Sequence, residues 1–256
     1  MPRAANGLWY ELAGSGEPVV LLHAGVADSR IWSPVFPLLA QRFQVVAYDQ
    51  RAYGCSAAWR GPYSLADDLF GVMDDVGFDR ACLVGLSRGG RIALEAALAE
   101  PDRVTRLVLV ASALPGYTPS WDVPEALERR WEAAEAAGDY ASMAELDLEV
   151  WAPIGVDDEL RAMFHQNAEA SNGDDPAVAP QPPAARRLGE LRAPTLVVTA
   201  DRDVPGMNEI GDVLEREIPG AERVVISAAD HMVPWREPRQ LAEALVAFLS
   251  AEVTPP

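Results

Sequence analysis

Short apolar runs alternate with helical segments along most of this chain, and few folds are compatible with that order. Four of the runs, 18–23, 43–49, 81–85 and 104–111, are apolar on both faces. Strands of this kind belong to a parallel sheet that is covered by helices on both sides. The other elements expected in this half are a strand at 7–12 and helices at 35–41, 65–76 and 88–100. The sequence therefore predicts an α/β domain with a mostly parallel central sheet.

The alternation stops at about residue 115, and no strand is indicated before residue 192. Three segments in this stretch look helical and amphipathic: 124–137, 141–151 and 157–170. The α/β pattern then returns in strands at 194–200 and 223–227 and a helix at 238–251. We therefore expect a core domain formed by 1–114 and 192–256, with a helical cap inserted at 115–191.

The charge of the chain argues against polyanionic partners. The chain carries 39 acidic and 21 basic residues, for a net charge of −18, whereas phosphate binding requires a basic surface. We therefore expect no nucleic acid partner and no attachment to an anionic membrane surface. All of the basic residues are arginines, which excludes a Schiff-base lysine and a P-loop lysine.

The cysteine content and the N-terminal segment indicate the cellular compartment of the protein. The two cysteines, Cys55 and Cys82, are too few for a disulfide scaffold or a thiolate metal site. The segment MPRAANGLWYEL lacks the apolar stretch of a signal peptide. No apolar run approaches the roughly 18 residues that a membrane-spanning helix needs. We therefore expect a cytoplasmic protein.

The segment Gly85 to Gly90, GLSRGG, fits the pattern G-x-S-x-G between a predicted strand and a predicted helix. This is the context of a nucleophile elbow, a sharp turn that exposes a serine hydroxyl above the sheet. The flanking glycines lack a Cβ, so the turn can close without a clash. The amide of Arg88 would then point from a helix N-terminus toward developing negative charge. The motif predicts Ser87 as a catalytic nucleophile.

A serine nucleophile needs a base and an acid that orients the base, in the chain order Ser, Asp, His for this kind of elbow. His231 follows the strand at 223–227, and no other histidine lies beyond the predicted insertion. Two acids, Asp201 and Asp203, follow the strand at 194–200. Asp201 stands at the strand end, where it could cap the turn, whereas Asp203 lies deeper in the loop. We therefore favour Asp203 as the orienting acid.

With these elements in place, the chain resembles the α/β-hydrolase fold family over nearly its whole length. Five segments carry the resemblance: His23-Ala24-Gly25, Asp49 to Ser56, Gly85 to Gly89, Ala200 to Asp203, and Asp230-His231 with Glu237-Pro238. They are similar to the family's His-Gly, D-x-x-G-x-G-x-S, G-x-S-x-G, G-x-x-D and G-H-x(5)-E-x-P patterns. The insertion falls where members of the family carry a cap over the active site.

The resemblance also implies an oxyanion hole made of two backbone amides. The amide of Arg88 is one, and the other would come from Gly25, with Val26 as the alternative. His23 is expected to hold its loop by hydrogen bonds, and His165 is expected on the cap surface or in the pocket lining. We expect neither a metal nor a cofactor.

Four positions depart from the family pattern, because Ala24, Ala52, Ala200 and Asp230 stand where the family has glycine. Each adds a Cβ where the backbone turns tightly, and alanine at a positive φ would be strained. None of the four removes a catalytic group. We expect the side chain of Asp230 to point away from the site, since this residue is adjacent to the predicted base.

A serine at the elbow favours acyl transfer, because family members that open epoxides or displace halide use aspartate there. We expect a serine hydrolase of the carboxylesterase or lactonase type, which cleaves a small carboxylic ester or lactone through an acyl-enzyme. The alternatives are a C–C bond hydrolase or perhydrolase of the same fold, and a slow-turnover ligand receptor that keeps the triad.

Part of the predicted cap should form the roof of an apolar pocket. We expect Val26, Trp121 and Trp151 to contact the substrate. Arg88 could bind a substrate carboxylate, but an ion pair with a nearby Asp or Glu is the expectation that we favour. The expected partner is thus a small ester or lactone, and the protein is expected to be a monomer or a homodimer.

Overall fold

The computed structural model describes residues 2–58, 62–120, 124–172 and 182–251. Within these ranges a seven-stranded sheet has the order β1-β3-β2-β4-β5-β6-β7. Its strands are β1 (Tyr10–Gly14), β2 (Pro18–Leu22), β3 (Gln44–Tyr48), β4 (Ala81–Leu86), β5 (Val104–Val110), β6 (Thr195–Ala200) and β7 (Glu222–Ile226). The β1 strand is antiparallel to β3, and every other neighbouring pair is parallel. The predicted α/β fold with a mostly parallel sheet is confirmed.

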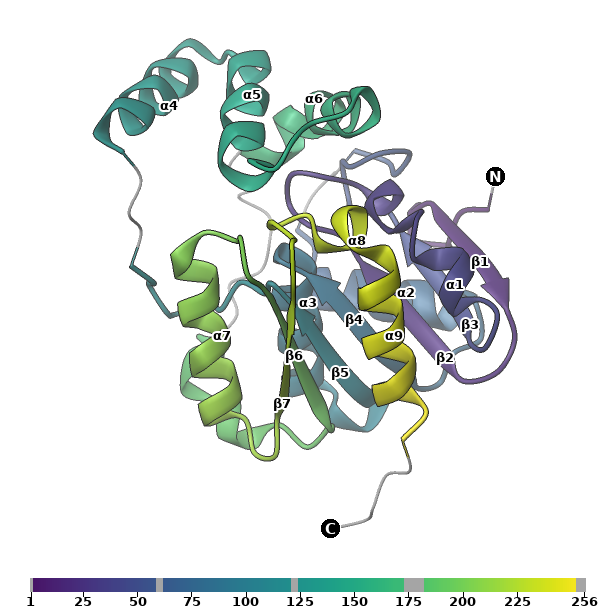
Figure 1. Cartoon of the computed structure of the whole chain (residues 1–256). Helices are drawn as coiled ribbons and strands as arrows, with labels where there is room; N and C mark the ends of the chain where they lie inside the picture. The colour runs from purple at the N-terminus through teal and green to yellow at the C-terminus, as the bar shows by residue number, and fades with distance from the viewer. Residues whose placement is uncertain (1, 59–61, 121–123, 173–181, 252–256) are drawn as a thin grey trace.

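Helices cover both faces of the sheet (Figure 1). One face carries α1 (Phe36–Leu39), α8 (Val233–Arg236) and α9 (Pro238–Leu249), and the other carries α2 (Leu65–Asp75), α3 (Arg88–Ala99) and α7 (Pro205–Glu217). Successive strand residues point to opposite faces. Val19 and Leu21 of β2 therefore join the buried cluster under α9, while Val20 and Leu22 join the cluster under α3. This two-sided burial explains why central strands such as β2 and β4 are apolar throughout.

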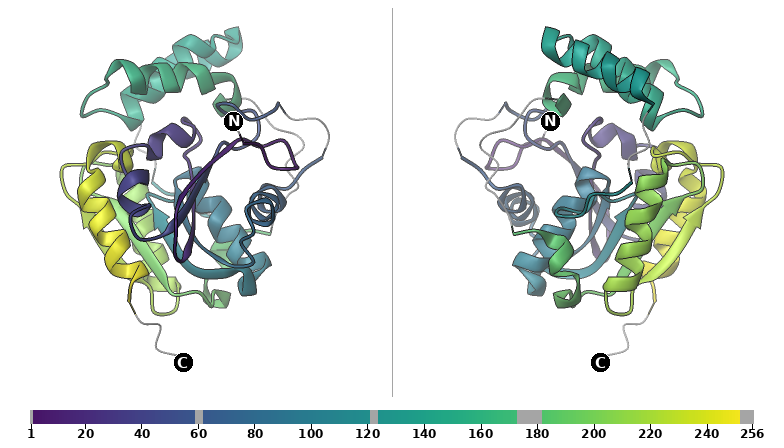
Figure 2. Two further views of the ribbon diagram at one scale, coloured as in Figure 1. Left: turned by 90° about the vertical axis from the view of Figure 1, so that its right-hand side faces the viewer. Right: turned by 90° about the vertical axis from the view of Figure 1, so that its left-hand side faces the viewer.

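Three helices lie between β5 and β6, namely α4 (Glu125–Ala137), α5 (Tyr140–Trp151) and α6 (Asp158–Asn172). They form a layer above the sheet, at the end where β4 leads into α3 (Figures 1 and 2). Leu127, Met143 and Leu146 form a small buried cluster between α4 and α5. The helices predicted at 124–137, 141–151 and 157–170 are thus present as α4, α5 and α6. The division of the chain into a core domain and a cap at 115–191 remains a prediction. None of the described helices is both long and apolar enough to span a bilayer.

Two local features differ from the sequence expectations. The first strand begins at Tyr10 and not at Gly7, because Gly7 has a φ of 85° and closes a turn onto the carbonyl of Ala4. Helix α7 has no counterpart among the predicted elements. Gly206 and Gly211 weaken its helical pattern, but a Cβ on Gly211 would lie only 2.4 Å from a β6 side chain. Close packing on the sheet therefore outweighs helix propensity there.

Candidate active site

Ser87 forms the sharp turn between β4 and α3, with a φ of 53° and a ψ of −112°. A positive φ is strained for a residue other than glycine, and such strain is concentrated at functional sites. The neighbouring glycines have no room for a side chain. A Cβ on Gly85 would lie 2.3 Å from the carbonyl carbon of Gly89, and a Cβ on Gly89 would lie 2.2 Å from the carbonyl oxygen of Leu22. The glycines of the motif are therefore required by the geometry of this turn.

His231 and Asp203 come together from the loops after β7 and β6. Nδ1 of His231 lies 2.9 Å from Oδ2 of Asp203, and neither side chain is more than 2% exposed. The amide of Val204 donates to the other carboxylate oxygen of Asp203 at 2.7 Å, which fixes the orientation of this acid. Asp201 is exposed and accepts a hydrogen bond from the amide of Ala229 instead. Of the two candidate acids, Asp203 is the one that contacts the histidine.

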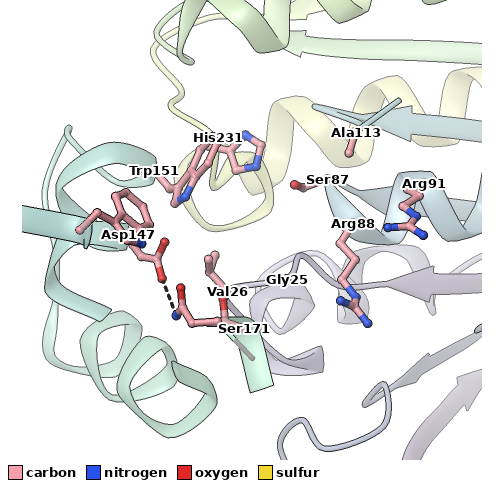
Figure 3. A pocket seen from close by; sticks show the side chains of 12 residues that line it. Gly25, Val26, Ser87, Arg88, Arg91, Ala113, Asp147, Trp151, Ser171 and His231 are labelled. Carbon is pink, nitrogen blue, oxygen red and sulfur yellow. Dashed lines mark hydrogen bonds between the residues drawn. The ribbon is translucent and has the colours of Figure 1, made fainter. Parts of the chain in front are cut away.

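Ser87 and His231 face each other in a pocket of about 480 Å³ between the sheet and the inserted helices (Figure 3). Six residues named from the sequence line it: Gly25, Val26, Ser87, Arg88, Trp151 and His231. The ring of Trp151 lies 4.5 Å from that of His231, measured between centroids. Helix α5 therefore covers the histidine directly. Trp121, which we also expected in the pocket, lies outside the described residues.

Several residues of the pocket wall were not predicted from the sequence: Arg91, Ala113, Asp147, Ser171 and Asn172. Asp147 is buried in α5, and Nδ2 of Asn172 donates to it at 3.3 Å. Burial raises the pKa of Asp147 to about 6. A signal for this residue was present in the sequence, because Asp147 lies four residues after Met143 and four before Trp151. All three share one face of the helix.

The guanidinium of Arg88 lies in the pocket wall beside Gly25 (Figure 3). Its Nε donates to Oε1 of Gln50 at 3.0 Å. Its central carbon lies 5.6 Å from the centroid of the Tyr53 ring. Among the described residues, no carboxylate forms an ion pair with Arg88. The ion pair that we favoured from the sequence is therefore not found in the described part of the chain.

The other two histidines occupy different places. His23 is buried, its Nδ1 lies 2.7 Å from the carbonyl oxygen of Ala24, and its Nε2 accepts from the amide of Gln50 at 2.9 Å. Burial lowers the pKa of His23, and both contacts suit the neutral ring. His165 contacts Glu145 at the cap surface and does not line the pocket. No cluster of His, Cys, Asp and Glu that could hold a metal occurs in the described ranges.

The four departures from the family's glycines have different structural consequences. Ala52 has a φ of 68°, so the strain expected of alanine occurs there. Ala24, Ala200 and Asp230 do not have a positive φ. At these three positions the replacement therefore introduces no such backbone strain.

Asp230 connects the core to the inserted helices. It is fully buried, lies 3.0 Å from a guanidinium nitrogen of Arg236, and accepts from the amide of Ile154 at 3.2 Å. Arg236 in turn donates to the carbonyl of Gly155. Both backbone partners lie in the loop between α5 and α6, so this ion pair anchors the insertion. The side chain of Asp230 points away from the pocket, and its anchoring role was not predicted from the sequence.

Comparison with known proteins finds similarity to proteins of the α/β-hydrolase fold. A family model described as alpha/beta hydrolase fold matches residues 17–134. A putative carbamate hydrolase, RutD of Caulobacter vibrioides, is 43% identical over 113 residues, which is 41% of this chain and only 42% of that relative. A protein of the same name from Azorhizobium caulinodans is 27% identical over 97% of this chain and 98% of its own length. The solved structure of a thermophilic esterase from Thermogutta terrifontis is 28% identical, with a TM-score of 0.77 over 94% of this chain and 92% of that one.

Proposed function

The chain belongs to the α/β-hydrolase fold family, and on this basis we propose that it is a serine hydrolase that cleaves a small carboxylic ester or lactone. The observation that carries the proposal is the arrangement around Ser87. This strained serine faces His231, and His231 is held 2.9 Å from the buried Asp203. A serine, a histidine and an acid with these relations form the nucleophile, base and orienting group of acyl transfer.

In the proposed mechanism, Oγ of Ser87 attacks the substrate carbonyl carbon while Nε2 of His231 accepts the hydroxyl proton. Asp203 accepts a hydrogen bond from Nδ1 of His231 and stabilises the imidazolium ion that forms. The negative charge on the carbonyl oxygen is stabilised by the amides of Arg88 and Gly25, with that of Val26 as the alternative second donor. His231 then protonates the leaving alcohol. A water molecule that gives its proton to the same histidine releases the acid.

The pocket favours a small substrate. Its volume is about 480 Å³, and Val26, Trp131 and Trp151 provide apolar walls. A lactone is a cyclic ester, so the same attack opens its ring. The named relatives add a second candidate, because two of them are putative carbamate hydrolases. A carbamate presents a carbonyl carbon to the same serine. A cytoplasmic location and a monomeric or dimeric state remain predictions of the sequence.

Hydrolysis of short 4-nitrophenyl esters tests the proposal. We expect the wild-type protein to turn over many times on the acetate and the butyrate, and Ser87→Ala to be inactive while it keeps its far-ultraviolet circular dichroism. A methyl carbamate and a γ-lactone are assayed beside these esters. A single turnover without a steady state would indicate a receptor and would refute an ester hydrolase. Full activity of Ser87→Ala would refute the assignment of the nucleophile.

A further inference from the structure

Arg88 is a cation in the pocket wall that no acid neutralises among the described residues. Acids are abundant in this chain, with 39 acidic residues against 21 basic ones. The neighbouring pocket residue Arg91 does have an acidic partner, Glu95, at 3.2 Å. A guanidinium that lies beside a nucleophile without a carboxylate partner is suited to bind an anion.

Neutral groups hold Arg88 in place. Its Nε donates to Gln50, and the Tyr53 ring lies against its guanidinium. Gln50 is itself fixed, because it is 1% exposed and its amide nitrogen donates to the carbonyl of His23 at 2.8 Å. That bond turns the amide oxygen of Gln50 toward Arg88. The two terminal nitrogens of Arg88 have no hydrogen-bond partner among the described residues.

We propose that Arg88 binds a carboxylate carried by the substrate, so that the enzyme acts on half-esters of short dicarboxylic acids or on lactones that bear a carboxylate. This inference rests on the proposed function. The carboxylate belongs to the acyl part of the substrate. The leaving alcohol must lie near His231, which protonates it, whereas the side chain of Arg88 points away from His231 (Figure 3).

The other charged groups of the pocket favour the same orientation of the substrate, with its carboxylate beside Arg88. Asp147 lies in the inserted helices, on the side of the pocket opposite Arg88 (Figure 3). Its ionised form would repel a carboxylate placed there. The charge of Arg91 is already compensated by Glu95. Among the described residues of the pocket, the place that suits a carboxylate is therefore beside Arg88, next to the serine and on the core side.

The test compares monomethyl glutarate with dimethyl glutarate, which share the same five-carbon chain. The diester carries a second, neutral methyl ester where the monoester carries a carboxylate. Released methanol is measured at pH 7. We expect kcat/KM of the wild-type protein to be roughly 10- to 100-fold higher for the charged monoester, the range for hydrogen bonds to a charged group. The ratio should fall to about one in Arg88→Gln and should remain partly in Arg88→Lys. The matched control Arg91→Gln should keep the wild-type ratio.

A binding measurement separates this inference from the proposed chemistry. Ser87→Ala is titrated calorimetrically with monomethyl glutarate, alone and combined with Arg88→Gln. If the wild-type protein hydrolyses neither these esters nor the 4-nitrophenyl esters, the proposed function fails, but binding that Arg88→Gln weakens about tenfold or more still supports the anion site. Equal kcat/KM for the two esters together with unaltered binding in the double variant would overturn the inference. So would loss of the preference in Arg91→Gln instead of Arg88→Gln.

Discussion

Replacing Asp147 by asparagine should stabilise the protein, and the gain should depend on pH. Asp147 is 4% exposed. Its burial raises its pKa from the ordinary 3.8 to about 6, because the charged form loses hydration. Hydrogen bonds from Asn172 and Trp151 offset only part of that effect. Among the described residues, Asp147 forms no ion pair. Above pH 6 the folded protein therefore contains a poorly compensated buried charge.

The direction of the pH dependence follows from the two pKa values. Because the folded-state pKa is the higher one, protonation of Asp147 stabilises the fold. This contribution is complete below pH 3.8 and is lost as the pH rises through about 6. A difference of about 2 pKa units corresponds to about 3 kcal/mol. Between pH 8 and pH 5 the expected change is about tenfold in the unfolding constant, or about 1.4 kcal/mol.

Urea unfolding followed by tryptophan fluorescence measures this effect. We expect Asp147→Asn to raise the free energy of unfolding by about 1 to 3 kcal/mol at pH 8, and the gain to be about 1.4 kcal/mol smaller at pH 5. Glu149→Gln, which alters an exposed acid of the same helix, is the control and should change stability by less than about 0.5 kcal/mol at either pH.

A pH-independent result would refute the reasoning. If Asp147→Asn changed stability equally at pH 5 and pH 8, its effect would come from packing or from altered hydrogen bonds, because neither titrates between these values. A loss of stability at pH 8 would show that the bonds from Asn172 and Trp151 outweigh the cost of burying the charge.

Three further predictions concern the site and the residues that support it. Asp203→Asn should lower kcat by about 10³- to 10⁴-fold, while Asp201→Asn should change it less than about tenfold; steady-state kinetics in which Asp201→Asn is the more damaging would assign the acid to Asp201. A Cβ on Gly90 would lie 2.3 Å from Oγ of Ser112, so Gly90→Ala should cost about 1 to 3 kcal/mol. Ser112→Gly in that background should restore part of the loss, and no recovery would contradict a clash at this contact. Asp230→Ala removes the ion-pair partner of the largely buried Arg236 side chain and should cost about 3 to 5 kcal/mol in urea unfolding; a cost below about 1 kcal/mol would show that this anchor is not needed.

The fold could be predicted from the sequence because its determinants are local. Strand segments that are buried on both faces must be apolar, so β2, β4 and the second half of β5 stood out as continuous apolar runs. Helix α7 did not stand out in the sequence, because contact with the sheet restricts which residues it can contain. Gly211 weakens the helix but allows it to lie against β6. A residue that is required only by its contact with a distant strand produces no recognisable pattern in the sequence around it.

The site could be predicted only in part, for the same reason. Ser87 and His231 belong to short motifs whose spacing reflects one turn each, and those motifs were visible in the sequence. The hydrogen-bond partner of Arg88 could not be identified from the sequence. Gln50 lies 38 positions earlier in the chain and reaches Arg88 because the strands before them, β3 and β4, both flank β2 in the sheet. Whether an amide or a carboxylate contacts Arg88 depends on residues that are distant in the sequence and meet only in the folded pocket.

Asp230 and His231 are adjacent in the chain and connect the inserted helices to the proposed catalytic base. The side chain of Asp230 binds Ile154 and Arg236 and so holds the loop between α5 and α6. The next side chain, His231, contacts Asp203 in the core and the ring of Trp151 in α5. A shift of the inserted helices must therefore change the orientation of His231 in two ways, through its contact with Trp151 and through the neighbouring residue Asp230. Substitutions in the inserted helices that reshape the pocket can keep full activity only if the loop between α5 and α6 stays in place. Substitutions at Val26 or Arg88, on the core side of the pocket, do not affect this loop.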